Sequence, residues 1–221
     1  MKALIAGAGR LGTQIAQVLA AAGEDVTLVD SDDDRIAELG GRLAARLVAG
    51  DACEPAVLEE AGALTADLLV AATGDDEDNL VISLLAKRQF ATPRVVARVN
   101  DTDNSWLFDH QWGVDVPVPA ATPLISLIEE ATGATDTVGL VRLATAGVTL
   151  IETHLDEHSA AAGRALADLK LPPGTVVAAV IHQAQPVVPD PDYHFHPGDT
   201  VLLVTKAATE ADVHNAFQFN G

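Results

Sequence analysis

Residues 1–130 alternate short apolar runs with longer segments whose apolar residues recur at helical spacing, and this alternation strongly limits the possible folds. Apolar residues at 11, 15, 18 and 19 illustrate the helical spacing. The six runs have the length of strands: Ala3–Ala6, Val26–Val29, Ala45–Val48, Leu68–Ala72, Val95–Val99 and Val114–Val118. Apolar strands that alternate with amphipathic helices form parallel sheets covered on both faces. The sequence therefore predicts an α/β fold with a Rossmann-like doubly wound parallel sheet.

The rhythm changes after a predicted helix at Ala121–Ala131 and a small, polar linker at Thr132–Thr137. Beyond the linker we expect strands at Val138–Leu143, Val148–Thr153, Val176–Ile181 and Thr200–Val204, helices at Ala161–Leu169 and Glu210–Phe217, a turn at Pro172–Gly174 and a proline-rich loop at Gln185–Pro197. These elements predict a smaller C-terminal α+β domain. The expected domains are residues 1–132 and 138–221. A module this small has a limited core, which makes dimerisation through it physically natural.

Charge and composition exclude several classes of function. The formal net charge of −19 disfavours direct binding to nucleic acids and to lipid headgroups, because both are anionic. No apolar run approaches the ~18 residues of a membrane span, and no charged leader precedes a long apolar stretch. The single cysteine, Cys53, excludes an intramolecular disulfide, and we expect it to be an inert apolar filler. We therefore expect a soluble, cytoplasmic protein.

A glycine-rich turn carries the first chemical signal. Gly7, Ala8, Gly9, Arg10, Leu11 and Gly12 form a G-x-G-x-x-G pattern between the first predicted strand and the first predicted helix. In that context the glycines permit a tight turn, a close approach to a pyrophosphate and close helix packing. Asp30 ends the second predicted strand, where an acid binds ribose hydroxyls and disfavours a 2′-phosphate.

The ends of the other predicted strands supply further candidates, because open parallel sheets bind ligands at their carboxyl edge. The third strand is followed by Asp51 and Ala52, the fourth by Thr73 and Gly74, and Arg98 lies near the end of the fifth. The acidic run 75–78 is interpreted mainly as a helix cap with first-turn carboxylates, and only its two ends remain ligand candidates.

These motifs together resemble the RCK (regulator of potassium conductance) family, and most closely its Trk/Ktr-type potassium-uptake regulatory subunits. The second half agrees, through Ala162–Leu166, Leu171-Pro172, Val176–Ile181 and Pro197–Asp199. The resemblance implies a cytosolic regulator that binds NAD(H), ATP or ADP in its N-terminal domain. It also implies a homo-oligomer, a dimer that assembles into a ring, beneath a membrane-embedded potassium transporter subunit.

Carried over by position, the resemblance implies that residues 7–11 contact the pyrophosphate and that Asp30 contacts the ribose. It places Asp51 and Ala52 beside the adenine, Thr73 and Gly74 beside the ribose and phosphate, and Arg98 on a phosphate. Arg10 is expected to reach a terminal phosphate. Some relatives carry a metal-linked glutamate after the sixth strand, but Ala120 occupies that position here. No metal site is therefore expected.

The C-terminal domain offers two further interpretations. In some relatives the dimer cleft of this domain binds cyclic di-AMP, and here the strand 176–181 and His182 would line it. A plain dimer interface is the other interpretation. His194 and His196 alternate on an extended stretch and could bind a metal, but we expect hydrogen-bonded or solvated histidines, since we identify no acid or cysteine at ligand spacing.

The alternative to a regulator is a small NAD-dependent dehydrogenase. Such an enzyme needs a proton acceptor beside the nicotinamide and a substrate pocket in the second domain. The sequence has no Tyr-x-x-x-Lys pair and no isolated His or Lys at a strand end that faces the glycine turn. We therefore expect a regulatory subunit and not an enzyme.

Overall fold

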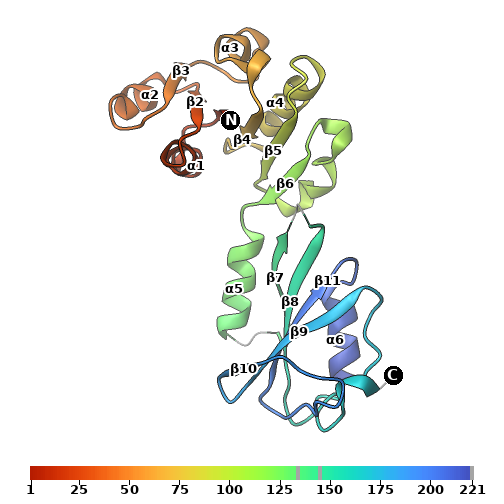
Figure 1. The fold of residues 1–221 in the computed structure, drawn as a ribbon. Helices are drawn as coiled ribbons and strands as arrows, with labels where there is room; N and C mark the ends of the chain where they lie inside the picture. Colours follow the sequence, from red (N-terminus) through yellow and green to blue (C-terminus); the bar gives the residue numbers. More distant parts are fainter. Residues whose placement is uncertain (133–134, 144–145, 220–221) are drawn as a thin grey trace. The chain divides into compact units, whose positions relative to one another are not determined.

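The computed structural model describes residues 1–132, 135–143 and 146–219, apart from the side chains of Pro123 and Glu130. The chain divides into two compact units, Met1–Ala121 and Thr122–Gly221 (Figure 1). Each unit contains one sheet. Among the described helices, none has the length and apolar character needed to cross a membrane.

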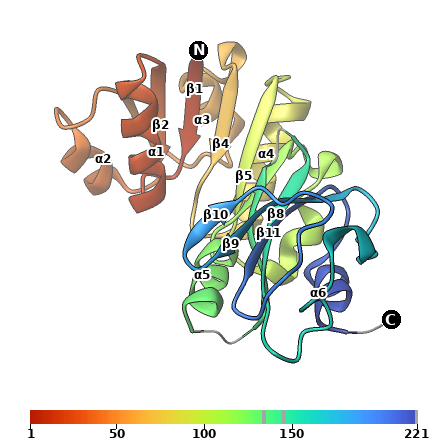
Figure 2. The ribbon, with the colours of Figure 1, turned by 60° about the horizontal axis from the view of Figure 1, so that its bottom comes forward.

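The first unit contains a six-stranded parallel sheet in the order β3-β2-β1-β4-β5-β6. Its strands are β1 (Lys2–Ala6), β2 (Asp25–Asp30), β3 (Arg46–Ala49), β4 (Leu68–Ala71), β5 (Arg94–Val99) and β6 (Val116–Pro119). Figure 2 shows β1, β4 and β5 side by side. The order reverses direction between β1 and β4, as in a doubly wound nucleotide-binding sheet. The predicted fold class of this unit is confirmed.

Helices connect the strands of the first sheet. They are α1 (Arg10–Ala21), α2 (Asp33–Leu39), α3 (Pro55–Glu60) and α4 (Asp76–Arg88), with 3-10 turns at Ala63–Thr65, Thr102–Leu107 and His110–Trp112. Leu4 belongs to one buried cluster and Ile5 to another, because successive side chains of a strand point to opposite faces. Both faces of the sheet are therefore covered. Val18 departs from the expected buried stripe of α1, since its side chain is 68% exposed.

Helix α1 approaches β1 closely at two glycines. A Cβ atom on Gly12 would overlap the carbonyl oxygen of Gly7, and Gly7 itself has φ +103°. A Cβ on Gly7 would lie 2.8 Å from the carbonyl oxygen of Ala72. Both positions therefore require glycine. Gly12 permits the close approach of the helix, and Gly7 also adopts a backbone conformation that favours glycine.

Asp76 anchors the start of α4 to the loop after β5. Its buried carboxylate accepts hydrogen bonds from the backbone N–H groups of Asn100 at 2.7 Å and Asp101 at 3.0 Å, and from Asn104 Nδ2 at 2.9 Å. Burial alone would raise the pKa of Asp76, but these hydrogen bonds outweigh it and lower the pKa. Asp75 is the N-cap residue, as expected, but its side chain makes no capping hydrogen bond.

The second unit contains an antiparallel sheet in the order β10-β9-β11-β8-β7. Its elements are α5 (Thr122–Thr132), β7 (Thr137–Leu143), β8 (Val148–His154), the 3-10 turn Leu166–Asp168, β9 (Thr175–His182), β10 (Gln185–Val187), β11 (Thr200–Thr205) and α6 (Glu210–Gln218). Phe195 and Phe217 are fully buried and meet edge to face at 5.7 Å. The smaller α+β architecture is confirmed.

Two predictions in the second unit are wrong. The helix expected at Ala161–Leu169 is only a 3-10 turn at its end, because Gly163 adopts φ +80° and Ala165 pairs with His194 in an antiparallel bridge. The loop expected from Gln185 begins instead as the short strand β10, paired with β9.

The linker expected at residues 132–137 falls between α5 and β7. Thr132 ends α5 and Thr137 begins β7, while residues 133 and 134 lie outside the described part of the chain. Helix α5, which was expected within the first domain, groups with the second unit and contacts β7.

We expect Gly12→Ala to destabilise the first unit by about 1–3 kcal/mol, because the new methyl group must displace backbone atoms. Urea unfolding followed by the fluorescence of Trp106 and Trp112, both in the first unit, measures the effect. Gly74→Ala is the matched control, since a Cβ there meets nothing within 4 Å. Equal stabilities of the two variants would contradict the close approach.

We expect Asp76→Asn to lower the free energy of unfolding at pH 7 by about 1.5–3 kcal/mol. The folded-state pKa of Asp76 is lowered, so its contribution is complete above the unfolded pKa of about 3.9 and is lost as the pH falls below it. The difference between wild type and variant should therefore shrink between pH 5 and pH 3. The control is Asp75→Asn, and a difference independent of pH would contradict the assignment.

Candidate functional site

A cleft of about 490 Å³ lies at the carboxyl edge of the first sheet. Nine of the predicted site residues line it: Gly7, Gly9, Arg10, Asp30, Asp51, Ala52, Thr73, Gly74 and Arg98. The cleft lies beside the reversal between β1 and β4, which is where doubly wound sheets bind their ligands. The fold therefore brings together predicted residues from the ends of five strands.

Three predicted residues do not line the cleft. Ala8 is buried, and Gly12 packs against Gly7. Leu11 is half-buried in the first turn of α1. These residues belong to the turn and the start of α1, but their side chains do not line the cleft.

The glycine turn presents the start of α1 to the cleft. Gly9 is the N-cap residue of α1 and no atom lies within 4 Å of the position of a Cβ there. No side chain caps this helix. Its first backbone N–H groups and the positive end of its dipole thus face a space that is open to an anion.

Asp30 binds the glycine turn from the end of β2. Its carboxylate accepts from Ala8 N at 2.6 Å and from Asp32 N at 2.9 Å, and Arg35 Nη1 lies 3.1 Å from each oxygen. Only 9% of Asp30 is exposed. Both oxygens therefore already have donors, and a ribose hydroxyl would share them with the guanidinium of Arg35, whose side chain is 45% exposed.

Further residues line the cleft. Gly50 precedes the predicted Asp51, and Asp75 and Asp78 are the two ends of the acidic run, which are ligand candidates. The residues that were not predicted are Val29, Ser31, Arg35, Ala72 and Ile82. Arg35 is the important omission because it brings a positive charge beside Asp30. Its signal was a basic residue in the otherwise acidic first half of a short helix.

The other side of the cleft follows β3. The Asp51 carboxylate accepts from Cys53 N at 2.8 Å, which fixes the turn that begins α3. Cys53 packs partly against the core, and burial, followed by the nearby charges of Asp78 and Asp51, raises the pKa of its thiol to about 12. The thiol is protonated at neutral pH, so the chemistry of a thiolate nucleophile is unavailable there.

A polar network joins the ends of β4 and β5. Asn79 Oδ1 accepts from Thr73 N at 3.0 Å, and Asn79 Nδ2 donates to the carbonyl oxygen of Arg98 at 3.0 Å. Asn79 is fully buried, so these bonds hold Thr73 and Arg98 side by side. Arg98 Nε is buried with no hydrogen-bond partner among the described residues. An unpartnered buried donor at a cleft wall is a place for an anionic ligand.

Family comparisons divide the chain in the same two parts. Residues 3–119 match the TrkA-N domain and residues 150–218 match the TrkA-C domain. The Trk system potassium uptake protein TrkA of Mycobacterium tuberculosis is 41% identical over 212 residues, which cover 96% of this chain and 95% of that protein. These relatives are named as potassium uptake proteins and not as enzymes.

Solved structures share the fold. The structure described as the GsuK Channel has a TM-score of 0.61 at 15% identity and covers all of this chain, which spans only 40% of that one. The structure described as Shewanella denitrificans Kef CTD in AMP bound form has a TM-score of 0.53 at 25% identity. The match covers 66% of this chain and 86% of the chain in that structure. The two domain matches and the near full-length identity show that the chain belongs to the TrkA family of Trk system potassium uptake proteins.

Proposed function

We propose that this protein is a cytosolic, nucleotide-binding regulatory subunit that gates a Trk/Ktr-type potassium uptake system. The observation that carries the proposal is the cleft at the sheet edge, where an open glycine turn, Asp30 and the unpartnered Arg98 Nε meet. Its volume of about 490 Å³ lies within the range of roughly 300–1,000 Å³ typical of small-molecule sites. Membership of the TrkA family supports the link to potassium uptake.

The proposed ligands are NAD(H), ATP and ADP. The uncapped start of α1, Arg10 and Arg98 would attract phosphates, and the small residues Ala52 and Gly74 would leave room for the adenosine. One structural relative supports an adenine nucleotide, since the Kef domain described above is in an AMP-bound form. The position of Asp30 at the end of β2 is the position of the ribose-binding acid in this class of sheet.

An oligomer is part of the proposal. Helix α5 buries its polar Ser126 and exposes four large apolar side chains: Leu124, Ile125, Leu127 and Ile128. A cluster of exposed apolar side chains on one helix favours a protein–protein contact. It supports a homo-oligomer, a dimer that assembles into a ring at the inner face of the membrane, held there by the transporter subunit and not by lipid.

Regulation would follow from differential binding. A nucleotide that binds one arrangement of the ring more tightly than another shifts the ring toward the first. The transporter that contacts the ring then senses the shift, typically with a coupling of about 1–3 kcal/mol. No chemical conversion of the nucleotide is required.

Among the described residues that line the cleft, the dehydrogenase alternative would have only aspartates as titratable proton acceptors, instead of the more usual histidine. The residues that line the cleft include no histidine, lysine, tyrosine or cysteine within the described part of the chain. A purified protein that binds NADH but transfers no hydride to or from a panel of alcohols and aldehydes supports the regulator. Substrate-dependent formation or loss of NADH would instead establish an enzyme.

The second unit has two possible roles. It could form a plain dimer interface, or its dimer cleft could bind cyclic di-AMP. His182, expected near its phosphates, has its Nδ1 2.7 Å from Asp199 Oδ1. This contact directs one side of the imidazole to a carboxylate, which weakens the case for a phosphate there. Calorimetry of the full chain at pH 6 and 7.5 decides the matter, because an absence of heat leaves only the interface role.

We expect Asp30→Ala to weaken the binding of NADH and ATP by about 10- to 100-fold, because a charge-assisted hydrogen bond of about 1.5–3 kcal/mol is lost. Calorimetric titration measures the dissociation constants. Asp33→Ala, an exposed position in the first turn of α2, is the control for loss of one negative charge. Unchanged dissociation constants for Asp30→Ala would place the pocket elsewhere.

We expect Arg10→Ala to weaken the binding of ATP more than that of ADP, with an intermediate effect on NAD, because the exposed guanidinium is expected to reach a terminal phosphate. The same titrations, at fixed ionic strength, give the three ratios. Arg42→Ala removes an exposed positive charge that does not line the cleft and serves as the control. Equal losses of affinity for all three nucleotides would show that Arg10 acts only through general electrostatic attraction.

A further inference from the structure

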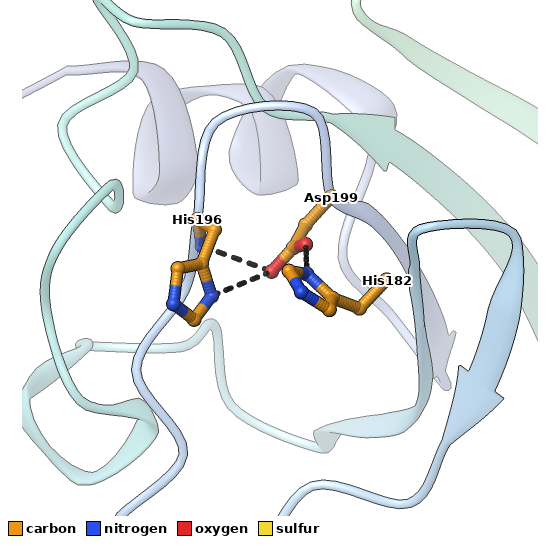
Figure 3. Close-up of side chains that lie close together, drawn as sticks. All are labelled: His182, His196 and Asp199. Atoms are coloured by element: carbon orange, nitrogen blue, oxygen red, sulfur yellow. Dashed lines mark hydrogen bonds and ion pairs between the residues drawn. The ribbon is translucent and has the colours of Figure 1, made fainter.

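Two imidazoles and a carboxylate meet at one end of the second sheet, in a place that the nucleotide cleft does not use (Figure 3). His182 ends β9, Asp199 directly precedes β11, and His196 lies in the loop that leads to β11. Their ligand atoms all lie within 4.8 Å of one another. We propose that this His182–His196–Asp199 cluster binds a late first-row divalent metal ion such as Zn²⁺.

The sheet register brings these residues together. Strands β9 and β11 are antiparallel neighbours, and Ile181 pairs with Thr200, so His182 and Asp199 fall at the same end. A tight turn adds His196, since Asp199 N donates to the carbonyl oxygen of His196 at 3.1 Å. Pro197 and Gly198, with φ +90° at the glycine, occupy the two central positions that a type II turn requires.

Asp199 supplies a fixed negative charge. The residue is fully buried, and its carboxylate accepts from His196 N at 2.9 Å, from His182 Nδ1 at 2.7 Å and from the hydroxyl of Tyr193 at 2.9 Å. Burial alone would raise the pKa of Asp199, but these hydrogen bonds outweigh it and lower the pKa. The carboxylate is therefore ionised at neutral pH beside two imidazoles that face partly toward solvent.

The two imidazoles are oriented and accessible. Nδ1 of His182 lies 2.7 Å from Asp199 Oδ1 and Nδ1 of His196 lies 3.8 Å from Asp199 Oδ2, so both nitrogens face the carboxylate. An ion bound by all three groups would replace the hydrogen bond between His182 and Asp199. The His182 side chain is 34% exposed and the His196 side chain 56% exposed, and their ring centroids lie 4.8 Å apart. Donors that share one ion through bonds of about 2.0–2.2 Å lie roughly 3–3.5 Å apart, so His182 would move slightly away from Asp199 and rotation of the exposed His196 ring would bring its nitrogen closer.

A purely structural network explains only part of this cluster. Asp199, Tyr193 and His182 would suffice to fix the turn, and they make close hydrogen bonds. The His196 ring adds little to such a network, because its Nδ1 lies 3.8 Å from Asp199 Oδ2, too far for a hydrogen bond. Metal binding gives a role to this third group.

The donor set selects the class of metal. Two imidazoles and one carboxylate suit zinc, nickel, cobalt or iron, whereas magnesium and calcium prefer sites made wholly of oxygen. Three protein ligands leave coordination positions for water or for a group on another molecule. The expectation of hydrogen-bonded or solvated histidines at 194 and 196 took no account of Asp199, which the turn brings beside His196. A bound ion would link β9 to β11 and would give the second unit a ligand site of its own.

The test uses the full-length protein after treatment with a chelator and its removal. Zn²⁺ is titrated in competition with a chromophoric chelator, with Mg²⁺ as the comparison ion. We expect one Zn²⁺ per chain and no competition from excess Mg²⁺. His182→Ala and His196→Ala should each lower the Zn²⁺ affinity by at least about tenfold. His194→Ala is the matched control, since His194 Nδ1 lies 2.8 Å from the carbonyl oxygen of Asp192 and outside the cluster.

Two further readouts keep the result independent of folding defects. Zn²⁺ should raise the unfolding temperature of the wild type and of His194→Ala, but not of His196→Ala, which removes a ring that is 56% exposed. The absorption spectrum of bound Co²⁺ should lack a thiolate band, which excludes Cys53 as the ligand. Equal Zn²⁺ affinity in His196→Ala and His194→Ala, or a thiolate band, would overturn the proposal.

Discussion

The contact between Gly12 and Gly7 is the constraint on which the first unit depends. With no side chain between them, helix α1 can lie directly on the end of β1, and its first turn reaches the carboxyl edge of the sheet. A larger residue at Gly12 would push the helix away from the strand, and a larger residue at Gly7 would clash with the backbone of Ala72 and Thr73. The open helix start, the tight turn and the cleft all follow from this one close approach.

Buried carboxylates then fix the loops around that edge. Asp30 joins the glycine turn to the start of α2, and Asp76 joins the start of α4 to the loop after β5. Asp199 plays the same part in the second unit, where it fixes the turn before β11. Each carboxylate accepts at least two hydrogen bonds from other parts of the chain or from across a tight turn. Such bonds offset the free-energy cost of burying a charge. In a chain with a net charge of −19, these few acids have structural roles.

The arrangement suits a sensor better than a catalyst. The cleft offers backbone N–H groups and arginines for phosphates, whereas the Cys53 thiol nearby is held protonated. The exposed apolar side chains of α5 belong to the other unit, where we propose the contact with further subunits. In this proposal nucleotide binding and assembly use different parts of the chain.

The sequence by itself determined the elements that depend on local pattern. Apolar runs and helical spacing located all six parallel strands, and the glycine turn, Asp30, Asp51, Thr73 and Arg98 were recognised as one edge because parallel strands share their carboxyl ends. Local pattern was insufficient where a single backbone angle decides the outcome. At residues 161–169 the alanine-rich stretch favoured a helix, but Gly163 and the bridge to His194 prevent it. Only the tertiary structure placed Arg35 on Asp30, left Arg98 Nε without a partner and set His182 against Asp199. Side-chain direction and antiparallel register decide those contacts, and neither can be read from spacing along one strand.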